Sequence, residues 1–272
     1  MSSKLNYVPH FKTYDDIREE MKRDLEYRLE SRQDKTWLGR PLYLRINIQL
    51  IVTQECPYDC PFCLERKHPM SGENDFEGQI RSLKLLLTTH PNARLTITGG
   101  EPSLYPAHIK KLTEIYSRYS NETFCSINTA GFDTAINGLA HINLSHNDYV
   151  HNNPIDFPHC TVQTIIKDGE TLADIKRQMD SIDAENFSFR FMSDIEKRDY
   201  PIDIWNELGK DPTIKIGTFR IGDFFVYATF NYNDKHARIT LGDMWQQIHN
   251  DYKDGYSNII IHPDGRIATN WK

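Results

Sequence analysis

The sequence predicts an α/β protein built on a largely parallel sheet, for three reasons. Short β-rich runs alternate with helix-period segments from residue 45 to about residue 192, which is typical of βαβ units. The 272 residues are within the length that a single α/β barrel uses. Hydrophobic residues make up 39% of the chain, enough for a large core. Because βαβ crossovers are right-handed, we expect the strands to curl one way, into a barrel or an open portion of one.

Six strands are expected in this region, because each run is rich in β-branched or aromatic residues. They cover residues 45–53, 94–98, 123–128, 141–145, 160–166 and 186–192. Apolar residues at helical spacing lie between most of them. These helical segments cover residues 77–89, 106–119 and 170–184, with a short, weak one at 133–140.

The flanking regions carry different patterns. Before the barrel, Ile17, Met21, Leu25 and Leu29 repeat every four positions, which predicts a helix over residues 14–32 that packs on the outside of the main domain. After residue 200 we expect short antiparallel strands, a helix and a final strand pair, at 214–220, 224–230, 238–241, 242–252 and 258–271. The predicted regions are an N-terminal helical extension (1–44), a barrel (45–199) and a small C-terminal α+β elaboration packed on it (200–272).

Charge and hydropathy exclude several classes of function. The chain has 32 Lys and Arg against 38 Asp and Glu, so a net charge of −6 argues against bulk nucleic-acid binding. No apolar run approaches the roughly 18 residues that a membrane span requires. Acidic residues stand near the start, where a signal peptide would be apolar. We therefore expect a cytoplasmic protein with no membrane partner.

Three of the five cysteines fall on one short loop after the first barrel strand. Cys56, Cys60 and Cys63 are spaced C-x3-C-x2-C. Three thiolates can each take one iron of a [4Fe–4S] cluster and leave the fourth iron without a protein ligand. The alternative is a zinc site that uses the same cysteines with His68, since three sulfurs and one imidazole make a closed tetrahedral set.

A second motif ends the next strand. Residues 94–98 run directly into Gly99, Gly100, Glu101 and Pro102, again at the carboxyl end, where a parallel barrel assembles its active site. The two glycines would let a ligand approach the backbone closely, and the carboxylate can accept hydrogen bonds from an ammonium group. The combination of this turn with the cysteine loop one strand earlier is a highly specific sequence signal.

Together these residues resemble the radical S-adenosylmethionine (SAM) superfamily, whose defining features are a C-x3-C-x-aromatic-C loop and a Gly-Gly-Glu-Pro turn. Phe62 stands at the aromatic position. The resemblance implies that Cys56, Cys60 and Cys63 hold a [4Fe–4S] cluster and that SAM chelates its open iron. It also implies that Glu101 contacts the SAM amino group and that Phe62 lies near the adenine.

The resemblance extends over roughly residues 45–195 and is greatest to the branch of the molybdenum-cofactor cyclase and the peptide-maturing enzymes. It implies a partial (β/α)6 barrel, with Asn128 at the end of the third strand. It also implies that Ser145 contacts SAM and that Arg190 points inward near the SAM carboxylate or ribose. Independently, polar residues alternate with apolar ones on several strands, so these side chains bond one another or line a wet cavity.

The chain departs from those relatives at its C-terminal region. Residues 259–268 resemble a strand pair that carries auxiliary-cluster cysteines elsewhere, but the cysteines are missing here. Cys125 and Cys160 lie early in their strands, so we interpret them as small buried side chains. Without auxiliary clusters, a redox-neutral rearrangement, cyclisation or epimerisation is favoured. The loop 146–159 is expected to be solvated, with a second metal site as the alternative.

The sequence thus predicts an oxygen-sensitive radical SAM enzyme that abstracts hydrogen from a peptide or natural-product precursor. It requires an external one-electron donor of flavodoxin or ferredoxin type. Candidate substrate contacts are Tyr58, His146, Tyr149 and Arg220. Two alternatives remain: a radical SAM enzyme acting on a nucleotide, and a non-catalytic zinc-binding scaffold.

Overall fold

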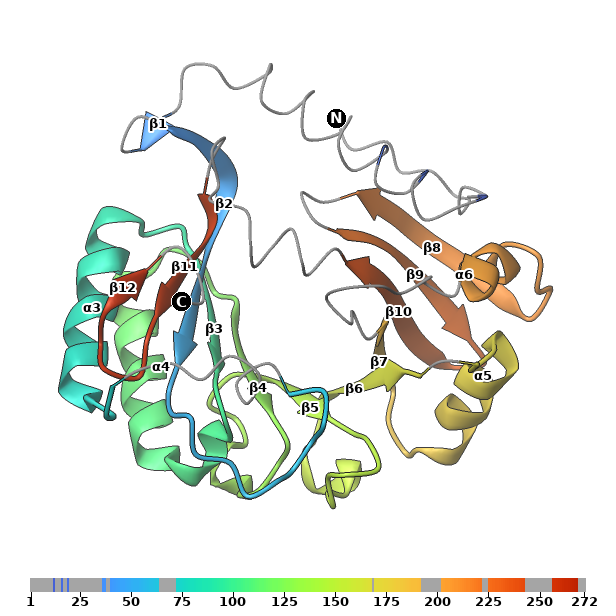
Figure 1. The fold of residues 1–272 in the computed structure, drawn as a ribbon, viewed down its shortest axis with the longest axis horizontal. Helices are drawn as coiled ribbons and strands as arrows, with labels where there is room; N and C mark the ends of the chain where they lie inside the picture. Colours follow the sequence, from blue (N-terminus) through green and yellow to red (C-terminus); the bar gives the residue numbers. More distant parts are fainter. Residues whose placement is uncertain are drawn as a thin grey trace. The chain divides into compact units, whose positions relative to one another are not determined.

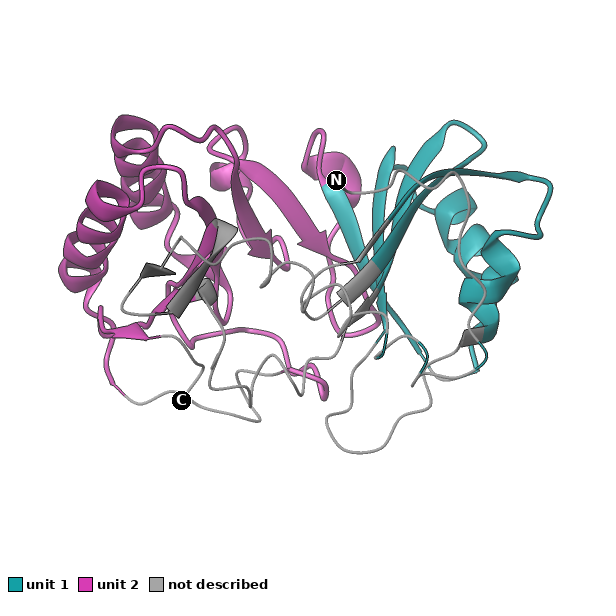
Figure 2. Ribbon diagram, turned by 90° about the horizontal axis from the view of Figure 1, so that it is seen from above, with its two compact units in different colours: residues 1–31, 161–250 teal, residues 32–160, 251–272 magenta. Residues whose placement is uncertain are grey.

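The computed structural model describes residues 12, 16, 19, 36–37, 40–63, 72–167, 169–191, 202–221, 225–242 and 256–268. They fall into two compact units (Figure 2). Unit 2 comprises residues 32–160 and 251–272, and unit 1 comprises residues 1–31 and 161–250. Of the helix predicted over residues 14–32, only Asp16 and Glu19 are described, and both are helical. Residues 243–252, where another helix is expected, lie outside the described part.

Unit 2 is built on a mainly parallel sheet (Figure 1). Its strands are β1 (Thr36–Trp37), β2 (Arg40–Ile51), β3 (Arg94–Thr98), β4 (Cys125–Thr129), β5 (His141–Ser145), β11 (Tyr256–Ile261) and β12 (Ile267–Ala268). The strand order is β12-β11-β2-β3-β4-β5, and β1 pairs with β2. Only the pairs β1–β2 and β11–β12 are antiparallel, so β2, β3, β4 and β5 end at the same edge. The predicted α/β fold with a parallel sheet is confirmed.

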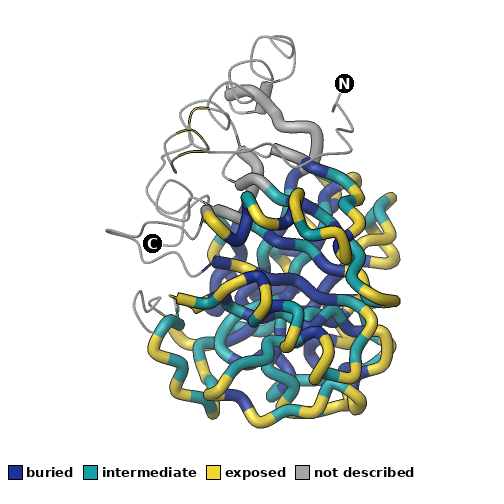
Figure 3. The backbone as a smooth tube through the Cα atoms, turned by 90° about the vertical axis from the view of Figure 1, so that its right-hand side faces the viewer, coloured by how far each residue is buried: buried dark blue, intermediate teal, exposed yellow. Residues whose placement is uncertain are grey.

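Two helices cover one face of this sheet. They are α3 (Phe76–Thr89) and α4 (Pro106–Tyr119), and they pack against each other. Asp75 caps α3 by accepting a hydrogen bond from the backbone N–H of Gly78. Leu83 and Leu112, one on each helix, are fully buried, as is Leu95 of β3. Figure 3 marks the buried positions along the chain. In unit 2 they include apolar side chains of the strands and of these two helices, and this layer forms the core of the unit.

The described part of unit 2 also contains three short 3₁₀ turns: η1 (Pro102–Leu104), η2 (Thr134–Ile136) and η3 (Pro154–Asp156). The segment at 133–140, where the sequence predicts a weak helix, forms only the single turn η2. Asp133 caps that turn by accepting from Ala135 N. Two residues after this turn, Gly138 adopts a positive φ of 76°, which keeps the helical conformation from continuing.

The C-terminal segment belongs to the same sheet. Strand β11 pairs in parallel with β2, and the following turn returns to the start of α3. The carbonyl of Pro263 accepts a hydrogen bond of 2.8 Å from Asp75 N and one of 2.9 Å from the buried amide of Gln79. Gln79 Nε2 also lies 3.0 Å from the carbonyl oxygen of Val52. The last described strands thus brace the end of β2, from which the cysteine loop departs.

Unit 1 carries a mixed sheet. Its strands are β6 (Thr161–Ile166), β7 (Asn186–Phe191), β8 (Ile214–Ile221), β9 (Phe225–Tyr232) and β10 (Lys235–Gly242), in the order β6-β7-β10-β9-β8. The pairs β6–β7 and β7–β10 are parallel, and the other two are antiparallel. The helices are α5 (Leu172–Ser181) and α6 (Ile202–Leu208). Trp205 of α6 is fully buried and meets Phe219 edge to face.

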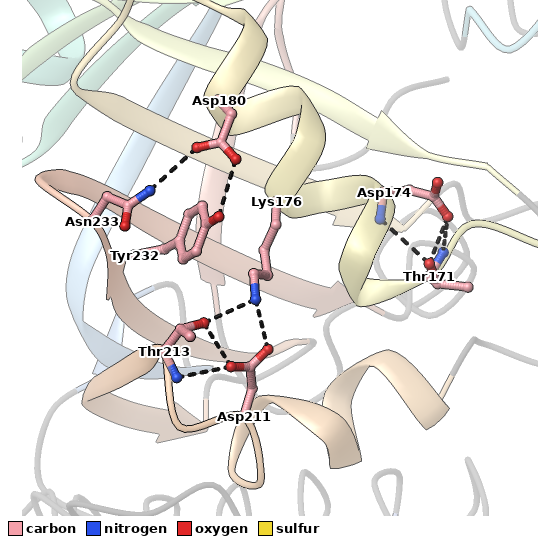
Figure 4. A network of polar contacts seen from close by, with 8 residues as sticks. All are labelled: Thr171, Asp174, Lys176, Asp180, Asp211, Thr213, Tyr232 and Asn233. Atoms are coloured by element: carbon pink, nitrogen blue, oxygen red, sulfur yellow. Dashed lines mark hydrogen bonds and ion pairs between the residues drawn. The ribbon is translucent and has the colours of Figure 1, made fainter.

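A polar network joins α5 to the antiparallel strands (Figure 4). Lys176 donates to Asp211 and to Thr213, at 2.9 Å each. One turn later, Asp180 accepts a hydrogen bond of 3.0 Å from the hydroxyl of Tyr232. Thr171 begins the helix with a capping box. These contacts hold α5 to the start of β8 and the end of β9, which lie side by side at one end of the antiparallel pair.

Candidate functional site

The cysteine loop leaves β2 and is bonded through its backbone to the turn that ends β3. Val52 N donates to the carbonyl of Thr98 at 2.9 Å. The Gly100 N–H then donates to Thr53 O at 2.6 Å, and the Glu101 N–H donates to Glu55 O at 2.7 Å. The two motifs that the sequence analysis singled out therefore form one continuous backbone structure.

Glycine is required in this turn because the cysteine loop passes directly against it. Gly99 has a φ of +134°, and a Cβ built there would lie 2.5 Å from the carbonyl oxygen of Thr53. A Cβ on Gly100 would lie 2.2 Å from the carbonyl oxygen of Glu55. The sequence suggested close approach of a ligand, and the structure shows that the protein's own backbone makes this approach.

Glu101 is fully buried, and its carboxylate accepts hydrogen bonds from the turn after β3 and from the end of β4. Oε1 accepts from the backbone N–H of Ser103 at 2.9 Å, from the Ser103 hydroxyl at 2.6 Å and from the Thr129 hydroxyl. Oε2 accepts from Ala130 N at 2.6 Å. A carboxylate offers about four acceptor sites, two on each oxygen. Glu101 thus links the turn after β3 to the end of β4. Among the described residues, Oε2 accepts from one donor and Oε1 from three.

The three loop cysteines are reduced, half-buried and electrostatically coupled. Burial and the neighbouring charges of Cys63 and Cys56 raise the pKa of Cys60 to about 11. Three thiolates on one short loop repel one another, and a bound metal cluster relieves that repulsion, so the chemistry of this donor set fits iron–sulfur ligation. Among the described residues, no group of three or more His, Cys, Asp or Glu side chains is gathered to hold a metal ion. His68, the fourth ligand of the zinc alternative, lies outside them.

Aromatic residues lie beside the loop. Phe62 contacts Tyr149 edge to face, with ring centroids 5.9 Å apart. Burial raises the pKa of Tyr58, and the charges of Glu101, Cys56 and Cys60 raise it further. The loop after β5, which bears Tyr149, therefore reaches the aromatic position of the cysteine motif.

Polar side chains line the sheet face of unit 2 that α3 and α4 leave uncovered. Asn143 donates to Asn128 at 2.8 Å across β4 and β5. Thr96 donates to Asn47 at 3.2 Å. All four residues remain half-buried, whereas the apolar residues beside them on each strand are buried. These predicted polar positions thus bond one another in part and keep partial access to solvent.

Asn152 joins the ends of β4 and β5, and the sequence analysis did not find it. Its amide nitrogen donates to the carbonyls of Ala130 at 2.8 Å and Ser145 at 2.7 Å. Its Oδ1 lies 3.0 Å from Nδ1 of His146. Asn152 stands in a loop with several other polar residues, and no spacing marks it out. Only its contacts show that it holds the strand ends together.

The predicted site residues divide between the two units. Unit 2 brings its members to one edge of the sheet: Cys56, Cys60, Phe62, Cys63, Gly99, Gly100, Glu101, Pro102, Asn128 and Ser145. Arg190 lies on β7 of unit 1. Arg220 lies on β8, and its side chain is outside the described part.

Cys125 and Cys160 are separate from this edge. Cys125 begins β4, at the strand end opposite Thr129. Burial raises its pKa to about 12, which disfavours the reactive thiolate. Cys160 is buried, and burial raises its pKa too. Cys160 therefore has the environment of a small core residue, whereas Cys125 is half-buried.

Comparison with known proteins gives matches among solved structures. No family model and no curated protein matches the chain. SuiB of Streptococcus suis bound to S-adenosylmethionine matches over 92% of this chain and 64% of that chain, at 12% identity and a TM-score of 0.53. SuiB bound to precursor peptide SuiA matches over 65% and 44%, at 13% identity and 0.46. The structure of anSMEcpe with bound AdoMet matches over 58% and 56%, at 14% identity and 0.44.

The match with a TM-score of 0.53 shows the fold. The chain shares with SuiB a mixed α/β fold with a parallel sheet, and it spans at most 64% of the length of these three chains. In the part of the chain that the structure describes, no helix has both the length and the apolar character needed to cross a membrane.

Proposed function

We propose that this protein is a radical SAM enzyme with a partial (β/α)6 barrel. In this proposal Cys56, Cys60 and Cys63 hold a [4Fe–4S] cluster, and SAM binds beside it. The observation that carries the proposal is the direct bonding of the cysteine loop to the Gly-Gly-Glu-Pro turn, through the N–H groups of Gly100 and Glu101. When bound, the cluster supplies the electron that splits SAM into methionine and a 5′-deoxyadenosyl radical.

The residues of unit 2 hold and orient the two groups. The backbone bonds between Thr53 and Gly100 fix the start of the cysteine loop. Oε2 of Glu101 accepts a hydrogen bond from Ala130 N, and in this proposal it accepts a second one from the SAM amino group. Phe62, backed by Tyr149, packs against the adenine. Asn128 and Ser145 border SAM on the polar face.

The substrate in this proposal is a peptide or natural-product precursor, from which the radical abstracts a hydrogen atom. An external donor of flavodoxin or ferredoxin type provides the electron. Cys125 and Cys160 have raised thiol pKa values and lie away from the cysteine loop, so they do not act as a second cluster site. A rearrangement, cyclisation or epimerisation is the outcome that needs no further electron acceptor. The fold shared with SuiB, a SAM-bound protein, is consistent with this chemistry.

The test is anaerobic reconstitution with iron and sulfide, followed by addition of SAM and dithionite. We expect the parent protein to produce 5′-deoxyadenosine, measured by mass spectrometry, and Cys63→Ala to produce none. Cys125→Ala is the matched control, because it removes a half-buried thiol outside the loop, and it should retain the activity. A colourless protein that binds zinc and forms no 5′-deoxyadenosine would overturn the proposal in favour of the zinc scaffold.

A further inference from the structure

One face of the unit 1 sheet is polar, and its strand register places the polar residues in two neighbouring rows. The first row is Gln163, Ser188, Arg238 and Thr229, on β6, β7, β10 and β9. The second row is Ile165, Arg190, Thr240 and Tyr227, on the same strands, and all of its members except Ile165 are polar. The opposite face is apolar and buried, with Phe189, Ile239 and Phe230 on it. Arg190 and Arg238 therefore share a face of adjacent strands, one row apart.

The two guanidinium groups have no compensating carboxylate in the described part of the chain. Arg238 donates to the Ser188 hydroxyl at 3.1 Å and lies 5.7 Å from the ring centroid of Tyr227. Arg190 keeps an exposed side chain, yet the surrounding protein, and secondly the charge of Arg238, lower its pKa to about 10. Both groups remain cationic at neutral pH, so this face carries two adjacent positive charges.

Two further polar groups on the same face are buried and lack hydrogen-bond partners among the described residues. They are Nε2 of Gln163 and the hydroxyl of Thr240. The Gln163 amide nitrogen is a donor, and Thr240 pairs directly with Arg190 across β7 and β10. Buried polar groups are rarely left unsatisfied in folded proteins. Their presence beside two unpaired arginines indicates a bound group that accepts hydrogen bonds.

We propose that Arg190, Arg238, Gln163 and Thr240 bind the phosphate group of a small-molecule ligand. A phosphate monoester carries a charge of about −1.5 to −2 at neutral pH, which matches two guanidinium groups, and its oxygens accept several hydrogen bonds. A single carboxylate carries one negative charge and leaves one guanidinium unpaired. The assignment goes beyond the proposed function, because the site lies wholly on unit 1 and none of its groups holds the cluster.

The experiment uses the full-length chain, with inorganic pyrophosphate as the probe and isothermal titration calorimetry as the measurement. We expect the parent protein to bind pyrophosphate. Arg238→Gln and Arg190→Gln should each raise the Kd for pyrophosphate at least tenfold. Thr240→Val preserves the side-chain shape, places no charge in the core and removes the hydroxyl. It should raise the Kd for pyrophosphate several-fold. The control is Arg118→Gln, since Arg118 is an exposed arginine on α4 of unit 2. It should bind pyrophosphate like the parent.

Three results would overturn the assignment. The parent could fail to bind pyrophosphate, or the Thr240 and arginine variants could bind it as the parent does. Alternatively, the arginine variants could lose affinity for SAM while pyrophosphate binding stays unchanged. That result would mean that these arginines bind the SAM carboxylate. Cys63→Ala should leave pyrophosphate binding intact, so failure of the radical chemistry and failure of the phosphate site are distinguishable.

Discussion

The hydroxyl of Tyr105 donates a hydrogen bond of 2.6 Å to the carboxylate of Glu55, and this bond ties the cysteine loop to the residue before α4. The same interaction raises the pKa of Tyr105. It is a side-chain bond to Glu55, separate from the backbone bond between Thr53 and Gly100. The loop is therefore held at two independent points before its first cysteine.

Removing this bond should loosen the loop more than it destabilises the protein. We expect Tyr105→Phe to lower the free energy of unfolding by at most about 1 kcal/mol, because the bond is solvent-exposed, and to reduce iron retained after reconstitution. Urea unfolding and iron analysis measure the two effects. Tyr119→Phe removes an exposed hydroxyl from the end of α4 and serves as the control. Equal iron content in both variants would contradict the assigned role.

The glycine in the turn after β3 should not tolerate a side chain. Gly100→Ala places a methyl group 2.2 Å from the Glu55 carbonyl oxygen, and we expect a loss of about 3 kcal/mol in unfolding free energy. Gly138→Ala is the control, because it meets nothing within 4 Å and only its positive φ makes it costly, by about 1 kcal/mol. Urea denaturation should separate the two variants. Similar losses would mean that the loop does not approach the turn this closely.

Asn152 should be needed for the geometry of two strand ends. Asn152→Ala leaves the carbonyls of Ala130 and Ser145 without their amide donor, which should cost about 1–3 kcal/mol. Asn152→Asp should not restore the loss, because an ionised carboxylate cannot donate. Thermal unfolding of both variants tests this. The control is Asn121→Ala, whose side-chain amide donates to Asn92 on an exposed turn, and it should be close to neutral.

Asp211 should stabilise unit 1 in a pH-dependent way. Hydrogen bonds from Thr213 and Lys176 lower its pKa to about 2, against about 3.9 in an unfolded chain. A lowered carboxyl pKa stabilises the fold above the unfolded value, and that stabilisation is lost as the pH falls towards 2. Asp211→Asn should cost about 1 kcal/mol at pH 7 and progressively less below pH 4. Chemical unfolding at several pH values tests this, with Asp183→Asn as the control, because Asp183 is an exposed aspartate of unit 1.

Cys125 should be inert in the folded protein. With its pKa raised to about 12, the thiolate fraction at pH 8 is about one in ten thousand. We expect no iodoacetamide adduct on Cys125 under native conditions and complete labelling in denaturant, as measured by peptide mass spectrometry. Rapid native labelling would show that this thiol is accessible and would reopen a redox role for it.

The sequence by itself determined the elements whose pattern is local. Strands 94–98 and 141–145 and helix 106–119 have the predicted bounds, because alternation and helical spacing are written in consecutive residues. The cysteine spacing and the Gly-Gly-Glu-Pro turn were likewise visible without coordinates. Since both follow strands of a parallel sheet, their placement at one sheet edge could also be anticipated.

Only the tertiary structure decided how those pieces contact one another. The pairing of β11 with β2, the bonds from Thr129 and Ala130 to Glu101 and the bond from Asn152 to Ala130 join residues distant in the chain. The same holds for the shared face of Arg190 and Arg238, which depends on the parallel register of β7 and β10. A one-residue change of register would move a side chain to the other face of the sheet. Local propensity does not specify that register, because it is set by packing between distant segments.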